Sequence, residues 1–351
     1  MKNMMKNTFL RAVVLFGLAQ ISGFSFQLST ATAQVTAHMK LWDRKYRYPR
    51  VNSIEFKGDV PSLASYDAVY GHGAMWENEW IGFRVYMDHR QSIDLYGKKQ
   101  ARMELDETNF YTTDQQWAEG YGEDILFVGG SIGAGSFRGY VDEAPVFVNP
   151  VKARGQRVLK EGPDTAIVEI YADDWQYQGH CLQFRQRFTA IRGHREVQVD
   201  VFLEEQGARC KKQERCFGQE ECPAKASSQS SVLNSQSSIL NPQSSILFAT
   251  GVQKFEYSTS VLMQSDGLVA SWGSNIPDKE GHPDRIHTLG MAVRVAPENL
   301  VKVKEDELNL LCIVRPVHGH IRYWLAVASD LQQQGGFHSA NEWFKWAQEM
   351  K

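Results

Sequence analysis

Apolar and polar residues alternate along much of this chain, and the alternation predicts β-strands. Residues 182–189 read LQFRQRFT and residues 197–203 read VQVDVFL, so each run is apolar on one side and mostly polar on the other. A period of two residues is typical of a strand with one buried face. Gly193 lies between the two runs. We therefore expect a β-hairpin with Gly193 in its turn.

Other regions repeat the pattern, and long amphipathic helices are scarce. Residues 310–314 and 321–328 are strand-like runs separated by a short turn, and we expect them to pair with each other. Ser339 and Glu342 have the spacing of a capping box, which predicts a short C-terminal helix. Many alternating strands joined by short turns favour an antiparallel sandwich or barrel over βαβ units. The predicted fold class is therefore mostly β and antiparallel.

One region interrupts the strand pattern. Residues 229–247 read QSSVLNS, QSSILNP and QSSIL, and they follow three evenly spaced cysteines, Cys210, Cys216 and Cys222. Because Ser, Asn, Gln and Pro dominate the repeat, we interpret residues 207–245 as an inserted surface loop. An oxidising compartment would permit a disulfide within the cysteine triplet. The chain has five cysteines, so at least one thiol stays free or pairs between chains.

The densest group of chemically useful residues lies between residues 70 and 98. Alternation over residues 81–87 and 93–98 predicts two strands joined by a short loop. The parity of these strands favours three opposed pairs: Asp88 with Asp94, Tyr86 with Tyr96 and Arg84 with Lys98. Like charges directly opposite each other lower the stability of a sheet. A face that carries them needs a reason, and a bound polar ligand is one.

Two other interpretations give this segment no separate chemistry. In the first, Arg84 pairs diagonally with Asp94, and Lys98 with Asp88. The result would be an ordinary solvated sheet face, because surface ion pairs contribute little stability. In the second, the same charges form a buried ion-pair core. Substitution of Arg84 or Asp94 would then unfold the protein with no separable effect on function.

Residue types in and before this hairpin suit acid–base chemistry on a polar ligand. The candidate catalytic residues are His72, Glu77, Glu79, Tyr86 and Tyr96. Candidate substrate-binding residues add charges for polar groups and aromatic rings for stacking on sugar faces. They are Trp76, Trp80, Arg84, Asp88, Arg90, Asp94, Lys98 and Arg138.

Two further motifs carry less chemistry. Residues 129–139, GGSIGAGSFRG, lack the Gly-Lys-Ser/Thr of a phosphate loop, and no helix is expected after them. We interpret them as a glycine-rich bend between strands; the alternative is close backbone approach to a ligand near Ser136 and Arg138. His318 and His320 have a spacing that would place two imidazoles on one side of a strand, as in some metal sites. No matching partner is visible, so no metal ligands are assigned.

The N-terminus predicts an exported protein. Basic residues precede a mostly apolar stretch, and Ala31-Thr32-Ala33 fits a signal-peptide cleavage site. We expect residues 1–33 to be removed and residues 34–351 to form a single domain, periplasmic or secreted from a bacterium. No later run approaches the ~20 apolar residues of a membrane span, so no membrane insertion is expected. A net charge of −3 gives no reason to expect nucleic-acid binding.

Four stretches carry a resemblance to a known family: GHGAMWENEWIGFRVYMDHRQSIDLYGK at residues 71–98, VGGSIGAGSFRG at 128–139, FATGVQKF at 248–255 and GGFHSANEWFKW at 335–346. Together they resemble domain of unknown function family 4861, a family of exported bacterial proteins. The likeness covers the mature chain apart from the insertion. The resemblance implies a fold similar to the galactose-mutarotase-like β-supersandwich, and a role in the degradation of glycans, especially of the pectin type. It implies no catalytic residues.

An acidic saccharide with uronic-acid units is the predicted partner, and β-elimination is the first hypothesis for its chemistry. Elimination needs a cation for the carboxylate, a base for the C5 proton and an acid for the leaving oxygen. The candidate cations are Arg84, Arg90 and Lys98, the candidate bases are His72 and Tyr86, and the candidate acid is Tyr96.

Other chemistries stay open. A glycoside hydrolase would use two carboxylates around the scissile bond. The candidates are Glu77, Glu79, Asp88 and Asp94. A mutarotase-like enzyme would need one acid and one base, such as His72 with a carboxylate. A non-catalytic glycan-binding accessory protein would need no turnover. No cofactor is assigned, although Ca²⁺ on Glu77, Glu79 or Asp88 would fit the preference of hard cations for oxygen ligands.

Overall fold

The computed structural model describes residues 35–42, 48–58, 69–206, 237–239, 246–274 and 285–350. The predicted signal peptide lies outside these residues, as do the cysteine triplet and most of the predicted insertion. All described residues belong to one unit of the chain, residues 33–351. Within the described ranges, no helix is long and apolar enough to cross a membrane.

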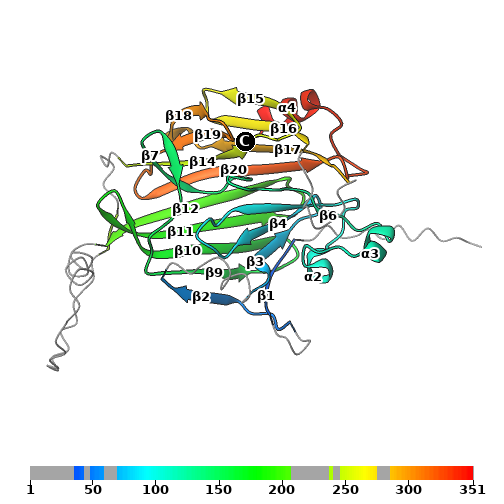
Figure 1. The fold of residues 1–351 in the computed structure, drawn as a ribbon, viewed down its shortest axis with the longest axis horizontal. Helices are drawn as coiled ribbons and strands as arrows, with labels where there is room; N and C mark the ends of the chain where they lie inside the picture. The colour runs from blue at the N-terminus through cyan, green and yellow to red at the C-terminus, as the bar shows by residue number, and fades with distance from the viewer. Residues whose placement is uncertain are drawn as a thin grey trace, which may run out of the picture. The chain divides into compact units, whose positions relative to one another are not determined.

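The described strands form three antiparallel sheets (Figure 1). The first sheet has the strand order β1-β3-β4-β5-β6. Its strands are β1 (Thr36–Leu41), β3 (Val69–Glu77), β4 (Ile81–Tyr86), β5 (Ile93–Gly97) and β6 (Glu123–Asp124). This sheet contains the chemically dense segment of the sequence, so it positions the candidate site.

The second sheet is the largest, with ten strands. Its order is β15-β16-β17-β20-β12-β11-β10-β9-β2, and β13 pairs with β12 beside this path. The strands are β2 (Ser53–Lys57), β9 (Ala153–Lys160), β10 (Thr165–Tyr177), β11 (His180–Ile191), β12 (Glu196–Gln206), β13 (Ser237–Ile239), β15 (Ser258–Gln264), β16 (Leu268–Ser274), β17 (Thr288–Val295) and β20 (His320–Ser329).

The third sheet has the order β18-β19-β14-β7-β8. Its strands are β7 (Arg138–Val141), β8 (Ala144–Val146), β14 (Leu247–Gln253), β18 (Leu300–Glu305) and β19 (Asn309–Val314). The described helices are short and lie in connections or at the end of the chain. They are α2 (Leu105–Thr108), α3 (Asp114–Ala118), α4 (Ala340–Gln348) and the 3₁₀ helix η2 (Pro297–Asn299).

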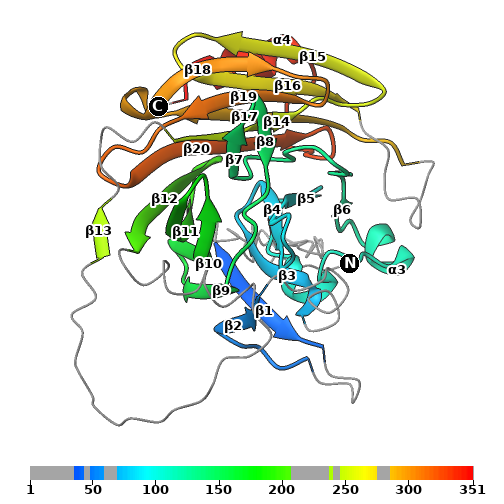
Figure 2. The same cartoon turned by 60° about the vertical axis from the view of Figure 1, so that its left-hand side comes forward.

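The first and third sheets cover the same face of the ten-stranded sheet, and Figure 2 shows β3 and β4 beside β9–β11. Phe184 and Phe188 of β11 point to that face, because residues four apart in a strand share a side. The Phe188 and Trp76 ring centroids are 4.7 Å apart, which joins β11 to β3. Phe184 stacks on Phe137, and Phe137 stacks on Phe248 of β14. These rings form one buried core across the three sheets.

Helix α4 packs on the other face of the ten-stranded sheet. Trp343 is fully buried and lies over Gly290 of β17, where a Cβ atom would come within 2.7 Å of its ring. The hydroxyl of Ser339 accepts a hydrogen bond from Glu342 N at 3.3 Å, as a helix N-cap does. The Glu342 carboxylate accepts from His338 N instead of Ser339 N, so the capping box forms in part. The predicted C-terminal helix is confirmed.

The fold class and one hairpin were predicted correctly, whereas one strand pair was not. Mostly antiparallel β structure is confirmed, and β11 pairs with β12 across a turn in which Gly193 has a φ of +79°. The expected pairing of residues 310–314 with 321–328 is wrong. Strand β19 pairs with β14 and β18, and β20 pairs with β12 and β17. An apolar run predicts that a strand is buried, but it does not predict which strand pairs with it.

The predicted insertion also contains regular structure. Strand β13 falls within residues 207–245 and pairs antiparallel with Glu204, Glu205 and Gln206 at the end of β12. The remaining residues of this region lie outside the described ranges up to Ile246. The interpretation of the whole region as a loop is therefore wrong at residues 237–239.

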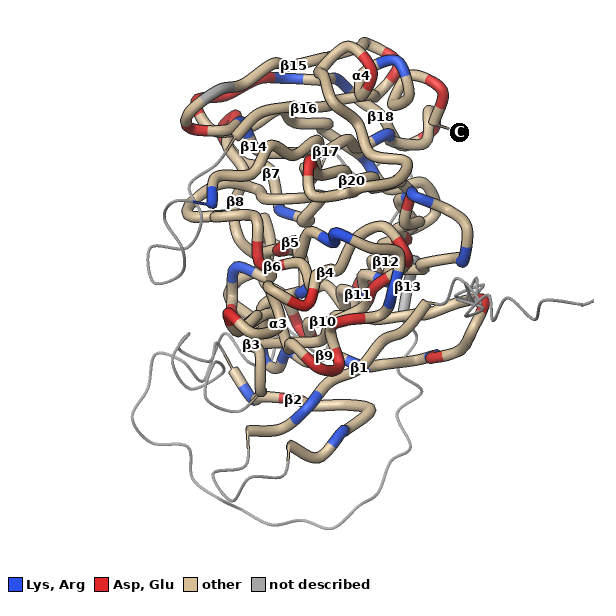
Figure 3. Tube along the Cα trace, turned by 90° about the vertical axis from the view of Figure 1, so that its right-hand side faces the viewer, with Lys and Arg blue, Asp and Glu red and all other residues tan. Residues whose placement is uncertain are grey.

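Charged residues of both signs are interspersed along the three sheets (Figure 3). Several form partly exposed pairs, such as Arg185 with Asp173 at 2.8 Å, and pairs of this kind contribute little stability. The buried charges carry more information, because a charge leaves water only when the protein supplies partners for it. A group of buried charges lies on β3, β4 and β5 and in the loop after β4.

Candidate functional site

The hairpin of β4 and β5 builds the site, and its register differs from the predicted one. Arg84 lies directly opposite Asp94. The three predicted pairs are therefore wrong: Asp88 with Asp94, Tyr86 with Tyr96 and Arg84 with Lys98. The loop is longer than expected, because it is closed by a hydrogen bond from Tyr86 N to Ser92 O at 3.0 Å. This register places opposite charges, not like charges, across the strands.

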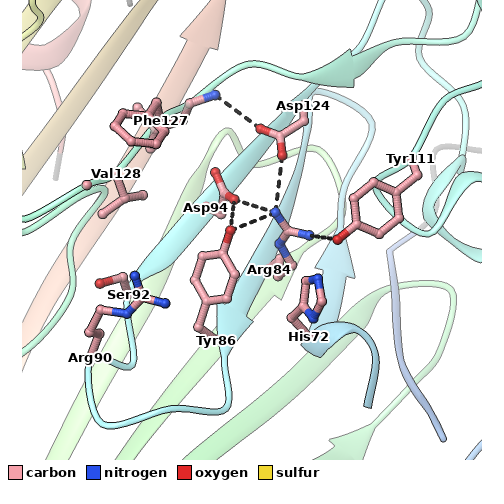
Figure 4. A pocket seen from close by; sticks show the side chains of 12 residues that line it. His72, Arg84, Tyr86, Arg90, Ser92, Asp94, Tyr111, Asp124, Phe127 and Val128 are labelled. Atoms are coloured by element: carbon pink, nitrogen blue, oxygen red, sulfur yellow. Dashed lines mark hydrogen bonds and ion pairs between the residues drawn. The ribbon is translucent and has the colours of Figure 1, made fainter. Parts of the chain in front are cut away.

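Arg84 is the centre of a buried hydrogen-bond network (Figure 4). Its Nη2 donates to Asp94 Oδ2 at 2.6 Å and to Asp124 Oδ2 at 3.1 Å. The same nitrogen reaches the Tyr86 hydroxyl at 2.8 Å, while Nη1 reaches the Tyr111 hydroxyl at 3.2 Å. Arg84 and Asp94 are each only 2% exposed. Because neither charge is hydrated, the guanidinium of Arg84 and the carboxylate of Asp94 must stabilise each other.

The two tyrosines in this network hold their hydroxyl protons differently. The Tyr86 hydroxyl donates a hydrogen bond to Asp94 Oδ2 at 2.7 Å. Burial together with this carboxylate raises the pKa of Tyr86 far above its usual range. Tyr111 is 45% exposed, and its oxygen accepts from Arg84. Burial raises the pKa of Tyr111 as well, although the adjacent guanidinium opposes that shift. Both phenols are neutral at pH 7, but the proton of Tyr86 is held by a carboxylate.

The network lines a cavity of about 340 Å³ on the face of the first sheet that points away from the core. This volume lies near the lower end of the roughly 300–1,000 Å³ that small-molecule sites occupy. The lining residues combine cations, carboxylates, hydroxyls and rings: His72, Arg84, Tyr86, Arg90, Ser92, Asp94, Tyr111, Asp124, Leu126, Phe127, Val128 and Gly129. Five of them were predicted from sequence: His72, Arg84, Tyr86, Arg90 and Asp94.

His72 reaches the cavity from an irregular point in β3. Its φ of +68° is left-handed, a conformation that few residues other than glycine adopt. Gly73 beside it lies so close to β4 that a Cβ atom would fall 1.8 Å from Val85 O. The His72 ring centroid lies 6.4 Å from that of Tyr86 and 6.1 Å from that of Tyr111. The strained backbone thus places an imidazole beside both phenols.

Arg90 reaches the rim of the cavity from the loop between β4 and β5. Its Nε donates to Asp88 Oδ2 at 2.6 Å, and its backbone N donates to Asp88 Oδ1 at 2.9 Å. Asp88 is fully buried, whereas the Arg90 side chain is 32% exposed, so the guanidinium is the accessible half of this pair. Arg138 lies behind the cavity and donates to the Ser92 hydroxyl at 2.9 Å. Burial lowers the pKa of Arg138 to about 10.

Glu77 and Lys98 form a second ion pair on the same sheet, outside the cavity. Lys98 Nζ lies 2.5 Å from Glu77 Oε2 and donates to two backbone carbonyls at 2.7 Å. The Glu77 carboxylate also accepts hydrogen bonds from Glu104 N and Leu105 N. Each side chain is 1% exposed. The pair therefore anchors the start of α2 to the sheet and does not reach a ligand in the cavity.

Three more predicted residues support the fold around the site. Trp76 lies in the main core. Trp80 stacks against Arg195, whose guanidinium carbon is 4.5 Å from the indole centroid. Glu79 accepts a hydrogen bond from Gly193 N at 2.8 Å and so braces the turn between β11 and β12. The structure does not bring these side chains to the cavity.

Tyr96, predicted as the acid, is fully buried beneath α2 and the residues that follow it. It is 0% exposed and packs with Met75, Leu105 and Phe110. Its hydroxyl lies 2.9 Å from Thr112 Oγ1, and burial raises the pKa of the phenol well above its usual range. A proton donor in the cavity must therefore be another residue.

Several cavity residues were missed by the sequence reasoning. Tyr111 and Asp124 follow the end of the hairpin at Gly97 by 14 and 27 residues, and no local periodicity marks them. The glycine-rich stretch did carry a signal, since Gly129 lines the cavity while Ser136 and Arg138 are buried behind it. The bend interpretation is confirmed, because strand β7 and not a helix follows.

Within the part of the chain that the structure describes, no group of three or more His, Cys, Asp or Glu residues is placed to hold a metal ion. The carboxylates considered for Ca²⁺ all contact protein donors: Glu77 binds Lys98, Glu79 binds Gly193 N, and Asp88 binds Arg90. Of the two histidines considered for a metal, His320 lies 2.7 Å from Asp200 Oδ1. We therefore assign no metal to the cavity.

Comparison with known proteins places the chain in a family. The family model described as domain of unknown function (DUF4861) matches residues 20–218 and 226–351. The chain belongs to the DUF4861 family. The predicted family is thus confirmed, and the match extends over most of the region predicted as an insertion, because it omits only residues 219–225 between its two parts.

No curated protein matches this DUF4861 chain. Among solved structures, it resembles a protein of Klebsiella pneumoniae subsp. pneumoniae MGH 78578 that is assigned as an aldose 1-epimerase. The two chains are 8% identical, with a TM-score of 0.38, and the alignment covers 90% of this chain and 94% of that one.

Proposed function

We propose that this DUF4861 protein acts on a saccharide that carries a uronic-acid unit, and that it does so by β-elimination. Three features of the cavity support the proposal. A cation, Arg90, stands at the rim, an imidazole, His72, stands beside the phenols, and exposed rings line the walls. Aromatic faces suit the apolar faces of sugars, and an arginine suits a carboxylate.

The observation that carries the proposal is the position of Tyr111. Arg84 Nη1 donates to its hydroxyl oxygen at 3.2 Å, so the guanidinium would stabilise the phenolate that forms when Tyr111 releases its proton. The other phenol, Tyr86, already donates to Asp94. Tyr111 is therefore the better acid, and it replaces Tyr96 of the sequence hypothesis.

The proposed step uses three side chains. Arg90 pairs with the uronate carboxylate and thereby acidifies C5–H, and His72 takes the C5 proton. The C4–O bond breaks as the C4–C5 double bond forms, and Tyr111 gives its proton to the leaving oxygen. The imidazolium and the phenolate then exchange their proton through solvent, which restores the starting state. No external oxidant or reductant is needed.

Hydrolysis by a carboxylate pair has less support. Asp94 and Asp124 both contact the same nitrogen of Arg84, and Asp94 is only 2% exposed. The other predicted carboxylates, Glu77, Glu79 and Asp88, do not line the cavity, and each already accepts hydrogen bonds from the protein. Two carboxylates on one guanidinium are poorly placed to flank a glycosidic bond.

Ultraviolet absorbance of the C4–C5 double bond tests the chemistry. Purified protein is incubated with uronic-acid oligosaccharides, and product absorbance is expected to rise. Tyr111→Phe and His72→Asn are each expected to lower kcat roughly 100-fold or more, the usual contribution of a general acid or base. Asparagine tolerates the positive φ of position 72. Tyr257→Phe, which changes a 59% exposed tyrosine that does not line the cavity, is the matched control.

Other outcomes identify other functions. Release of reducing ends without new absorbance would replace elimination with hydrolysis. Faster anomer exchange, measured by polarimetry, would identify a mutarotase-like enzyme. Saccharide binding without turnover, unchanged in Tyr111→Phe, would identify a glycan-binding accessory protein.

We also propose that the protein works outside the cytoplasm after loss of residues 1–33. The basic and apolar N-terminal pattern and the Ala31-Thr32-Ala33 site support this. Mass spectrometry of protein from the periplasmic and culture fractions of a producing bacterium is expected to show Gln34 as the first residue. A full-length chain confined to the cytoplasm would overturn export.

A further inference from the structure

A second cavity of about 550 Å³ lies beside the first and shares a wall with it. Phe127, Val128 and Gly129 line both cavities. The rest of the second lining comes from the next two residues of the same loop, from the end of β14 and the connection after it, from β15, and from the end of β18 and the turn that follows. The two cavities therefore lie on either side of one loop.

The dividing loop, residues 127–131, leads into the glycine-rich stretch of residues 129–139, and buried groups hold it in place. The Gln253 side chain, 3% exposed, donates to Phe127 O at 3.1 Å and accepts from Ser131 Oγ at 2.7 Å. The next residue, Ile132, donates its backbone N–H to Asn309 Oδ1 at 2.7 Å. Gly129 has a φ of +55°, which lets the chain turn there. The wall is thus a built feature and not a loose surface loop.

Apolar side chains are exposed along this path. Phe127 on the shared wall is 50% exposed, and Leu308 and Val261 in the second cavity are 47% and 41% exposed. A ring and neighbouring aliphatic groups offer a surface on which the C–H face of a sugar packs. One saccharide chain that crosses the loop would contact these side chains in turn.

The two cavities differ in charge. The first is lined by two arginines and two aspartates, so its fixed charges balance. The second is lined by one lysine and three glutamates: Lys254, Glu256, Glu305 and Glu307. Lys254 pairs with Glu305 at 3.0 Å, which leaves two glutamates in excess. A uronate in the second cavity would meet like charge, whereas a neutral sugar would not.

We infer that the second cavity is a subsite for a neutral sugar, and that the substrate is a saccharide in which a uronate is linked to a neutral unit. The inference rests on the proposed function for the identity of the unit in the first cavity. The shared wall supplies the continuity between the subsites, and the charge difference sets their order. A chain made of uronates alone would place a carboxylate against the excess glutamates.

Calorimetric binding to full-length His72→Asn protein tests the inference without turnover. Two tetrasaccharides are compared at low ionic strength: one of uronates only, and one that alternates uronate with a neutral hexose. The alternating ligand is expected to bind about tenfold more tightly, and salt is expected to reduce the difference because it screens exposed charges. Replacing Glu256, Glu305 and Glu307 with Gln together is expected to remove the preference. Glu349→Gln, an exposed glutamate outside both cavities, is the matched control and is expected to keep it.

A steric variant separates the cavities. Val261→Trp fills part of the second cavity from β15 and is expected to weaken tetrasaccharide binding at least tenfold while a uronate monosaccharide binds as before.

Equal binding of the two tetrasaccharides, or a preference that survives the triple glutamine change, would overturn the inference even if turnover is seen. Preferred binding of the alternating ligand without turnover in the unsubstituted protein would sustain the inference and overturn the proposed elimination. If neither tetrasaccharide binds, both the inference and the proposed elimination are overturned.

Discussion

Two ion pairs on the first sheet each join a carboxylate to a cation, but their surroundings differ. Glu77 and Lys98 lie on β3 and just after β5, and both side chains are 1% exposed. Arg84 and Asp94 lie on β4 and β5, and their side chains are only 3% and 2% exposed, but their network extends to Asp124, whose side chain is 21% exposed at the cavity. One pair is sealed on every side, and the other ends at a surface.

The difference comes from what covers the sheet. Backbone N–H groups of Glu104 and Leu105 close over Glu77, and α2 starts there. Over Arg84, the later segments supply side chains, Tyr111 and Asp124, and leave a cavity between them. A carboxylate that binds backbone groups stabilises the fold, whereas a network that ends in exposed hydroxyl and carboxylate groups is available for chemistry. Within the one predicted cluster, Glu77 and Lys98 therefore support the fold, whereas Arg84 and Asp94 belong to the candidate site.

The strongest test of the sealed pair is Lys98→Met. This change leaves the Glu77 charge buried without its cation, and removal of one partner of a buried pair costs about 3–5 kcal/mol. We expect the free energy of unfolding, measured in urea, to fall by that amount. Activity per folded molecule is expected to stay within twofold of the unsubstituted protein, because Lys98 does not line the cavity.

A second substitution provides the control. Glu77→Gln added to Lys98→Met removes the uncompensated charge, so it is expected to recover part of the lost stability. If Lys98→Met unfolds at the same urea concentration as the unsubstituted protein, the pair is not a sealed anchor, and the comparison with Arg84 and Asp94 loses its basis.

These distinctions mark the limit of what the sequence predicts. Alternation predicted the strands and the hairpin around Gly193, because that pattern depends on residues close in sequence. The partner of β19 and the register of β4 against β5 depend on the closure of loops and on contacts from elsewhere. Five predicted site residues line the cavity, yet the cover over Glu77 and the arrival of Tyr111 and Asp124 are long-range events that no local pattern encodes.

A third cluster lies between the two cases and responds to pH. His287 Nε2 lies 2.6 Å from Glu123 Oε1, and its Nδ1 lies 3.5 Å from Asp330. Burial opposes the charged form, but hydrogen bonds from the imidazole to the two carboxylates outweigh it and raise the pKa of His287 to about 9. Glu123 precedes Asp124 in β6, so this cluster fixes the strand that brings Asp124 to Arg84.

Because the folded pKa of His287 is raised, its contribution to stability is complete below pH 6.5 and is lost as the pH rises through 9. Raising the pKa from 6.5 to about 9 corresponds to about 3.4 kcal/mol at 1.36 kcal/mol per pKa unit, and solvent screening at this partly exposed cluster reduces it to about 2–3 kcal/mol. We expect the difference in unfolding free energy between the unsubstituted protein and His287→Gln to shrink by that amount from pH 6.5 to pH 9.5. A difference that stays constant with pH would show that His287 is not protonated in the folded protein.

The smallest expected effect on stability belongs to Arg84 and Asp94, the pair at the cavity. Asp94→Asn removes one charge, but Arg84 keeps Asp124 and the hydroxyls of Tyr86 and Tyr111, so we expect a loss of only about 1–2 kcal/mol of unfolding free energy. Activity is expected to fall at least tenfold, because the guanidinium that supports Tyr111 loses its closest partner at 2.6 Å. The urea midpoint and kcat are measured on the same preparation. Asp124→Asn, at the exposed end of the network, is the control and is expected to cost less stability still. If Asp94→Asn destabilises the fold as much as Lys98→Met without a separate loss of kcat, the cavity-side network is also a structural anchor, and the two ion pairs do not differ in kind.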